Sequence, residues 1–268
     1  MVRVGIATFL ETLPLSCGLD LPPWNQRLAT TVFDDPRRAA AALDAESIDL
    51  ALLPADLLAP RSQRLEIVPG LAVTSRGGCG IARLLYQPPL ADIERVASRC
   101  DGHGAATLLE LLFAGSGKTL TFDRRAPQAR LLTLGEDPEP LAEGWRSLDL
   151  STAWSEVTGG PMVWWVWAAR PGIVDREIYG ILHGARSRGR HDLGTHFEQW
   201  MPGAGAGRRR EVLRAFEDRV RLRLGNRELA ALERLWREME SLALVPMAGP
   251  PRLLSFGGRP NCRPSRGE

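Results

Sequence analysis

The stretch from Pro161 to Ala169, PMVWWVWAA, is apolar throughout and rich in tryptophan and valine. Gly159-Gly160 precede it and Pro171-Gly172 follow it, so residues that favour turns bound it on both sides. A short continuous apolar run between such residues predicts a strand in the centre of a sheet. We expect its tryptophans to pack in the core rather than to form a stacking platform, because large aromatic side chains in such runs are usually buried.

Segments with strand and helix patterns alternate along the chain before this stretch. Expected strands are 2–8, 48–53, 65–73, 81–86, 93–97, 119–122 and 131–134, and expected helices are 35–44 and 105–114. This alternation predicts an α/β fold whose sheet is mostly parallel. The C-terminal third is expected to be helical, with Asn226 as the N-cap of a helix that packs on the first part of the chain. Its apolar face is expected to hold Leu229, Leu232, Trp236, Met239 and Leu242.

The composition is that of an ordinary globular protein and excludes several functions. Of the 268 residues 44% are hydrophobic and 25% charged, enough for one large domain or two small lobes. Acids and bases are interspersed along the chain and the net charge is +2, which gives no argument for nucleic acid or an anionic membrane as partner. Apolar stretches are too short to span a bilayer, so no membrane insertion is expected. The short run Arg208 to Arg210 is expected to form a solvated helix face.

The four cysteines predict neither a metal site nor a disulfide framework. Cys17, Cys79, Cys100 and Cys262 lie far apart, with no C-x-x-C spacing. Charge and proline interrupt the apolar N-terminal segment, so we expect no signal peptide. Reduced thiols and the absence of such a peptide favour the cytoplasm.

The stretch AGSGKT, residues 114–119, contains the only lysine of the chain, Lys118. A phosphate-binding loop needs a glycine five residues before Gly117, but that position is Leu112. The expected context is also reversed, with a helix before the glycines and a strand after them. We therefore predict a helix end and a turn here, and no binding of ATP.

Four stretches together resemble the chorismate dehydratase family of the futalosine route to menaquinone. They are FLETLPLSCGL from Phe9, IDLALLP from Ile48, SRGGCG from Ser75 and, the most specific, DLSTAWSEVTGGPMVWWVWAAR from Asp149. The resemblance covers nearly the whole chain. It implies an α/β, two-lobed fold like that of type 2 periplasmic binding proteins, with a central cleft. The first lobe is then expected to comprise 1–86 and 166–256 and the second 87–165, with Ile81–Tyr86 and Met162–Ala169 as hinge strands and 257–268 as a flexible tail.

The resemblance also implies an activity, namely removal of water from chorismate, a dicarboxylate, to give 3-[(1-carboxyvinyl)oxy]benzoate. It implies no cofactor and no metal, and it leaves a homo-oligomer open. Glu11 stands where the family carries asparagine, and together with His103 it is the candidate catalytic pair. The residues expected to contact the substrate are Leu10, Thr12, Gly80, Ile81, Gly104, Ala105, Gly135, Glu136 and Met162.

Simpler interpretations of the two candidate catalytic residues stay open. Glu11 could be a carboxylate stabilised by a helix N-terminus, and His103 a loop histidine exposed to water. Since Ile81 also replaces a family serine, a second hypothesis is a non-catalytic paralogue that binds a ligand or partner with the same two lobes.

Overall fold

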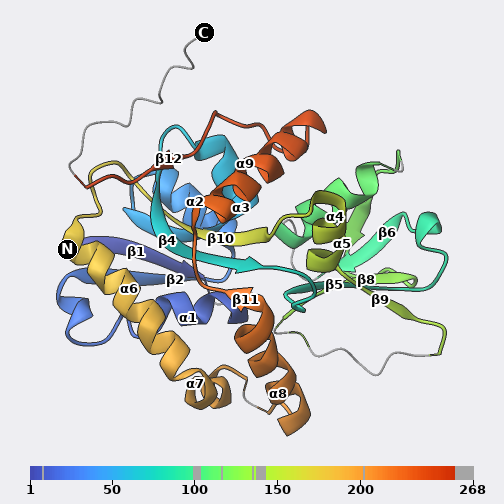
Figure 1. Ribbon diagram of the computed structural model, residues 1–268, viewed down its shortest axis with the longest axis horizontal. Coiled ribbons are helices and arrows are strands. Elements are labelled where there is room, and N and C mark those ends of the chain that lie inside the picture. The colour runs from blue at the N-terminus through green and yellow to red at the C-terminus, as the bar shows by residue number, and fades with distance from the viewer. Residues whose placement is uncertain are drawn as a thin grey trace.

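The computed structural model describes residues 1–7, 9–98, 104–115, 117–134, 136, 143–201 and 203–256. Two sheets organise these residues (Figure 1). The larger sheet has the order β11-β4-β10-β3-β1-β2, with β12 beside β4, and the smaller has the order β7-β6-β8-β5-β9. The strands of the larger sheet are β1 (Val2–Ala7), β2 (Leu28–Phe33), β3 (Leu50–Pro54), β4 (Glu66–Ser75), β10 (Met162–Ala169), β11 (Val220–Arg221) and β12 (Arg252–Leu253). Those of the smaller sheet are β5 (Ala82–Tyr86), β6 (Arg95–Ser98), β7 (Thr121–Asp123), β8 (Ala129–Thr133) and β9 (Arg146–Asp149).

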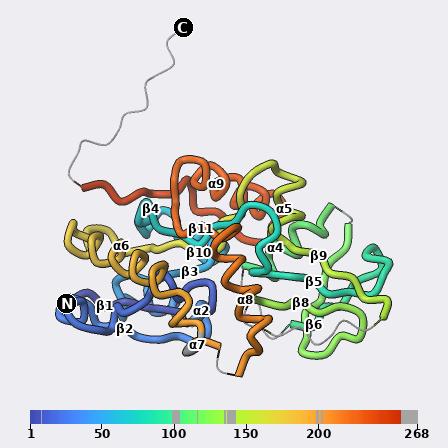
Figure 2. The backbone as a smooth tube through the Cα atoms, turned by 60° about the horizontal axis from the view of Figure 1, so that its bottom comes forward, coloured from blue at the N-terminus to red at the C-terminus, as the bar shows by residue number. Residues whose placement is uncertain are grey.

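Helices surround both sheets (Figures 1 and 2). With the larger sheet lie α1 (Leu13–Ser16), α2 (Pro36–Asp44), α3 (Ala55–Leu58), α6 (Arg176–His191), α7 (Leu193–Trp200) and α9 (Asn226–Ser241). With the smaller sheet lie α4 (Gly104–Ala114) and α5 (Leu150–Thr158), whereas α8 (Ala206–Arg214) lies between the two groups in both views. Short 3-10 turns are Leu10–Thr12, Trp24–Gln26, Ala59–Arg61 and Leu90–Asp92, and a π turn is Ala215–Arg219.

Strand β10 confirms the prediction from its sequence. All eight of its residues are buried, and it pairs antiparallel with β3 on one side and β4 on the other. The left-handed Gly159 (φ 67°) ends α5 just before it, a conformation that costs glycine little. Because β10 returns from the other lobe, it runs against β1 to β3, which are parallel. The expectation of a mostly parallel sheet is therefore wrong, and both sheets are mixed.

The chain crosses between the two sheets at two places. The first lies between Ser75 at the end of β4 and Ala82 at the start of β5, and the second between Asp149 and Met162. Strand β5, expected to close the first lobe, pairs with β8 and β9 of the smaller sheet instead. No observation tests the expected lobe boundaries directly. Because β5 pairs in the smaller sheet and β10 in the larger one, we propose different boundaries that follow the sheets, with the crossings at 76–81 and 150–161.

Helix α9 packs on the larger sheet, where its Trp236 indole donates a hydrogen bond to the carbonyl oxygen of Ala55 at 2.8 Å. Two details of the expected helix are wrong. Gly225, not Asn226, is the N-cap, because the Glu228 carboxylate accepts the N–H of Gly225 at 2.8 Å. Leu242 follows the end of the helix and is exposed.

Helix α8 joins the two lobes through Arg208. Its guanidinium donates to the carbonyl oxygens of Leu134 (2.6 Å) and Glu136 (2.9 Å), which follow β8 of the smaller sheet. The side chain is only 7% exposed and also pairs with Glu211 at 2.8 Å. The expectation of a solvated face at Arg208–Arg210 is therefore wrong for Arg208, because two carbonyl groups after β8 accept hydrogen bonds from its guanidinium group.

Candidate functional site

A small cavity between the two lobes holds four of the residues expected to form the site. Its volume is about 20 Å³, the space of about one water molecule. The larger sheet and its turns contribute Phe9, Glu11, Pro54, Trp164 and Trp165, and the other side is formed by Ile81, Gly104, Ala105 and Thr133. Glu11, Ile81, Gly104 and Ala105 line this one space although they come from separate parts of the chain, and their assignment to a site stays a prediction.

Glu11 is a buried carboxyl group in the 3-10 turn that follows β1. It is 3% exposed, and its Oε1 accepts a hydrogen bond from the Trp165 indole at 3.1 Å. Its Oε2 has no hydrogen-bond partner among the described residues. Burial raises the pKa of Glu11 to about 7, although its own backbone N–H and the indole act in the opposite direction. At neutral pH this side chain can therefore either accept or donate a proton.

Trp164 and Trp165 both line the cavity although they are neighbours in one strand. A β-bulge between Val163 and Trp165 shifts the pairing of β10 with β4, which interrupts the usual alternation of side chains. The Trp164 indole donates to the hydroxyl of Ser75 at 2.8 Å, and Trp165 lies against Phe9 with ring centroids 5.0 Å apart. The tryptophans are buried, as predicted, and two of them also form a wall of the cavity.

Asp56, at the start of α3, is a second buried carboxyl group between the lobes, and the sequence analysis missed it. It is 3% exposed, and its Oδ2 accepts a hydrogen bond at 2.8 Å from the hydroxyl of Thr107 in α4. Its Oδ1 has no partner within the described chain. Burial raises its pKa to about 6, and the Thr107 hydroxyl acts against that rise. Its place two residues after the buried strand β3 was the available signal, because strand ends point towards sites in such folds.

Three expected contact residues are buried beside the cavity but do not line it. Leu10 and Met162 belong to the core. The hydroxyl of Thr12 donates to the carbonyl oxygens of Ala7 (2.9 Å) and Phe9 (2.7 Å), so it stabilises the turn that carries Glu11.

The remaining expected residues lie elsewhere. Gly80 borders a different hollow of about 280 Å³, and its N–H donates to the Asp149 carboxylate at 2.7 Å. The Glu136 carboxylate accepts the backbone N–H of Thr133 at 2.7 Å. His103 and Gly135 lie outside the described residues.

The described part of the chain holds no cluster of the kind that binds a metal ion, and the AGSGKT stretch does not form a phosphate-binding loop. No group of three or more histidine, cysteine or acidic side chains gathers there as for a metal ion. Helix α4 ends at Ala114, Gly117 adopts φ 71°, and β7 begins at Thr121, which confirms the predicted helix end and turn. Lys118 donates to the carbonyl oxygen of Ala91. No described helix is long and apolar enough to cross a membrane.

Solved structures with the same arrangement define the class of fold. Protein AF1704 from Archaeoglobus fulgidus is 16% identical, with a TM-score of 0.68 over 91% of this chain and 98% of that one. The periplasmic aliphatic sulphonate binding protein SsuA from Escherichia coli is 14% identical, with a TM-score of 0.57 over 99% of both chains. The Candida albicans protein CA3427, described as having the generic periplasmic binding protein fold, is 9% identical, with a TM-score of 0.56 over 96% and 98%. This chain has the two-lobed periplasmic-binding-protein fold.

The family follows from the sequence itself. The profile of the family described as Menaquinone biosynthesis matches residues 2–241, and the chain belongs to that family. No curated protein matches the chain.

Proposed function

We propose that this protein is a lyase that binds chorismate between its lobes and removes water from it, giving 3-[(1-carboxyvinyl)oxy]benzoate for menaquinone biosynthesis. Membership of the family supports the substrate and the pathway. The observation that carries the proposal is Glu11, a buried carboxyl group on the cavity wall with a pKa of about 7. We also propose the cytoplasm as its location, which the free thiols of Cys17 and Cys79 support.

The proposed reaction needs one base and one acid. Chorismate loses a ring proton and a hydroxyl group, and the ring becomes aromatic, which supplies much of the driving force. Ionised Glu11 would take up the ring proton, and the resulting carboxylic acid would donate it to the departing hydroxyl, so that water leaves and Glu11 is regenerated. A carboxyl group with a pKa near the working pH is suited to both steps.

The first turn of α4 is the proposed position for one carboxylate of the substrate. Gly104 and Ala105 begin this eleven-residue helix and line the cavity. The N–H groups and the dipole at a helix N-terminus stabilise negative charge. A Cβ on Gly104 would lie 3.6 Å from Oδ1 of Asp56, an ordinary van der Waals contact, so the start of the helix lies directly beside that carboxyl group.

The lobes must separate before such a ligand can enter. The cavity of about 20 Å³ is far smaller than the roughly 300–1,000 Å³ of typical small-molecule sites. The hydrogen bond between Thr107 and Asp56, which joins the lobes beside the cavity, would open in that motion. Closure over the substrate would then exclude water from Glu11.

The direct test is chorismate consumption by the purified protein, with the product identified by mass spectrometry. Wild-type protein is expected to form the benzoate, and Glu11→Gln to turn over at least about tenfold more slowly, because proton transfer by a positioned group contributes about 10²–10⁴-fold. Glu156→Gln is the matched control, since Glu156 is exposed on α5. Turnover unchanged by Glu11→Gln would refute the role of this residue.

One observation favours a second candidate, a non-catalytic ligand-binding or partner-binding member of the family. The described residues that line the cavity include no arginine, lysine or histidine, so among them a dicarboxylate would meet no cationic side chain. Under this hypothesis wild-type protein consumes no chorismate, and Glu11→Gln strengthens the binding of a dicarboxylate measured by calorimetry, because it removes a like charge. Turnover by the wild type would exclude this candidate.

A further inference from the structure

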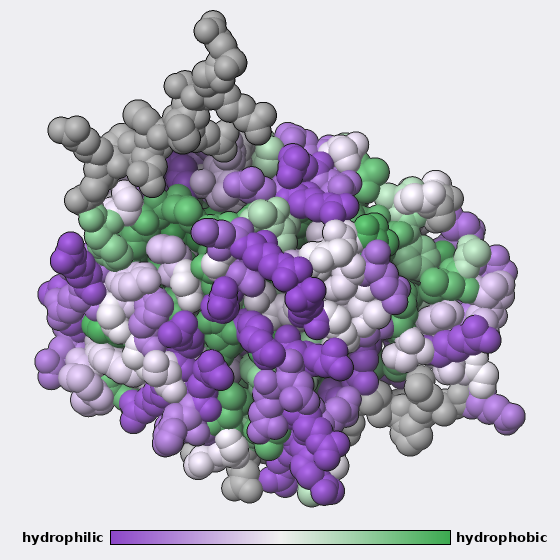
Figure 3. All heavy atoms as spheres, in the orientation of Figure 1, coloured by the Kyte–Doolittle hydropathy of each residue, from purple (hydrophilic) through white to green (hydrophobic). Residues whose placement is uncertain are grey.

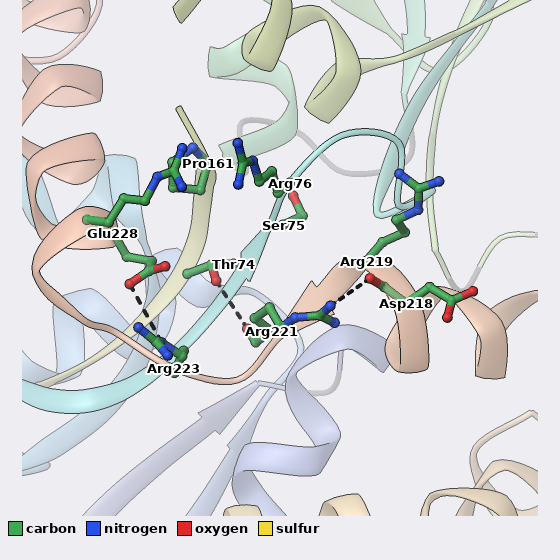
Figure 4. A pocket seen from close by; sticks show the side chains of 10 residues that line it. Thr74, Ser75, Arg76, Pro161, Asp218, Arg219, Arg221, Arg223 and Glu228 are labelled. Carbon is green, nitrogen blue, oxygen red and sulfur yellow. Dashed lines mark hydrogen bonds and ion pairs between the residues drawn. The ribbon is translucent and has the colours of Figure 1, made fainter. Parts of the chain in front are cut away.

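A larger hollow with a volume of about 470 Å³ lies apart from the candidate site (Figure 4). Three segments form it. They are the end of β4 together with Arg76, then Pro161 just before β10, and the stretch 218–228 that contains β11 and the start of α9. It shares no lining residue with the cavity beside Glu11. Its volume falls within the usual range for small-molecule sites.

The hollow carries a marked excess of positive charge. Its lining contains five arginines and two carboxylates, Asp218 and Glu228, an excess of three positive charges. The surface in Figure 3, seen in the orientation of Figure 1, is strongly hydrophilic over β11 and α8. The arginines are Arg76, Arg219, Arg221, Arg223 and Arg227, and all five are exposed.

Two of these guanidinium groups contact carbonyl or carboxylate oxygens of neighbouring residues. Arg221 donates to the carbonyl oxygens of Asp218 (2.9 Å) and Glu217 (3.2 Å), and thus follows the backbone of its own turn. Arg223 Nε lies 3.9 Å from the carboxylate of Glu228, which also accepts the N–H that caps α9. Figure 4 shows both guanidinium groups directed at these partners.

Arg76, Arg219 and Arg227 have no acidic partner within the described part of the chain. A guanidinium nitrogen of Arg219 lies over Gly77, where a Cβ would be 3.3 Å away. Three unpaired guanidinium groups around one hollow repel each other, and an anion between them removes that cost. Guanidinium groups bind phosphate oxygens through paired hydrogen bonds, and several of them from different segments suit a ligand with more than one negative group.

We propose that this hollow, which we call the arginine hollow, is a binding site for a small molecule that carries a diphosphate or two phosphate groups. The proposal is independent of the proposed dehydratase activity, because no residue of the arginine hollow lines the cavity of Glu11. The site lies where the chain crosses between the sheets, since Ser75-Arg76 leave β4 and Pro161 enters β10. The Ser75 hydroxyl also accepts the hydrogen bond of Trp164, which connects the two sites structurally.

The test is calorimetric titration of the full chain with pyrophosphate at constant ionic strength, because screening would otherwise change along the titration. We expect saturable binding with one site per chain, and weaker binding of orthophosphate. Arg219→Ala and Arg227→Ala should each weaken binding at least about tenfold, as the loss of one charge-assisted hydrogen bond predicts. Thermal unfolding of each variant establishes that it is folded.

Arg38→Ala is the matched control, because it removes the same charge from an exposed position on α2. Pyrophosphate affinity that is unchanged in this variant supports a specific site. An equal loss of affinity in all three variants would show that only the net charge of the protein matters, and would overturn the proposal. Absence of saturable pyrophosphate binding would also overturn it. Tighter binding of a hexaglutamate peptide than of pyrophosphate would instead identify a protein partner and refute a small phosphorylated ligand.

Discussion

Replacing Glu11 by glutamine should change how the free energy of unfolding depends on pH. The pKa of this carboxyl group is raised from 4.5 to about 7, mainly by burial. Its contribution to stability is therefore complete below pH 4.5 and is lost as the pH rises through about 7, because the folded state must then hold a buried charge. A shift of about 2.5 pKa units corresponds to about 3 kcal/mol.

Glutamine keeps the shape of the side chain and can still accept the hydrogen bond from Trp165. The amide does not titrate, so its effect on stability is a constant offset. Asp56 titrates in both proteins and cancels in the difference. The free energy of unfolding of Glu11→Gln minus that of the wild type should thus increase by about 3 kcal/mol between pH 4 and pH 8.

Urea unfolding, followed by tryptophan fluorescence at half-unit pH steps, measures this difference. Glu156→Gln, on the exposed face of α5, should show a constant difference from the wild type. If the difference for Glu11→Gln stays constant within about 0.5 kcal/mol, the carboxyl group is hydrated in solution and its assigned burial is refuted.

Three further outcomes are expected. Gly189→Ala should destabilise the protein by about 1–3 kcal/mol or more, because the new Cβ would lie 2.3 Å from a backbone oxygen of α1. Gly180→Ala in the same helix meets open space and should not destabilise it in this way. Equal losses of unfolding free energy in urea for the two variants would contradict this packing. Trp165→Phe removes the indole donor to the buried glutamate, so the pH midpoint of the stability change should move upwards, and an unmoved midpoint would show that the hydrogen bond has no influence. Lys118→Ala should leave the calorimetric titration with ATP and magnesium unchanged, because Lys118 belongs to a turn and not to a phosphate-binding loop. Saturable micromolar binding that Lys118→Ala abolishes would contradict that assignment.

Local patterns predicted most of the strands and several helices. The apolar run of β10 and the capped start of α2, where Asp35 accepts the N–H of Arg37, depend on neighbours in the sequence. Pairing partners are not local. The sequence of β5 does not specify whether it joins β4 or β8, and in the structure it pairs with β8 and β9.

The candidate site was predictable only where the resemblance supplied positions. The resemblance singled out Glu11 and Ile81, and both line the same cavity, but the sequence could not show that the Glu11 carboxyl group is buried. Asp56 was missed because a carboxylate after a strand is common, and only the packing of Thr107 against it reveals its burial. Arg208 was interpreted as a surface charge because the carbonyl groups that it contacts lie about 70 residues away along the sequence, where no local pattern points to them.

The hydrogen bonds that Arg208 makes from α8 to the smaller lobe bear on the rates of ligand binding and release. Two hydrogen bonds from a charged donor, each worth about 1.5–3 kcal/mol, must break or be replaced by water when the lobes separate. Leu134 and Glu136 do not line the cavity beside Glu11, so these hydrogen bonds would persist in a closed lobe arrangement with ligand bound. Under the proposed opening they would slow the entry and the exit of a ligand by the same factor and cancel in its equilibrium affinity. If the lobes open as proposed, helix α8 sets the residence time of a ligand separately from the strength of its binding.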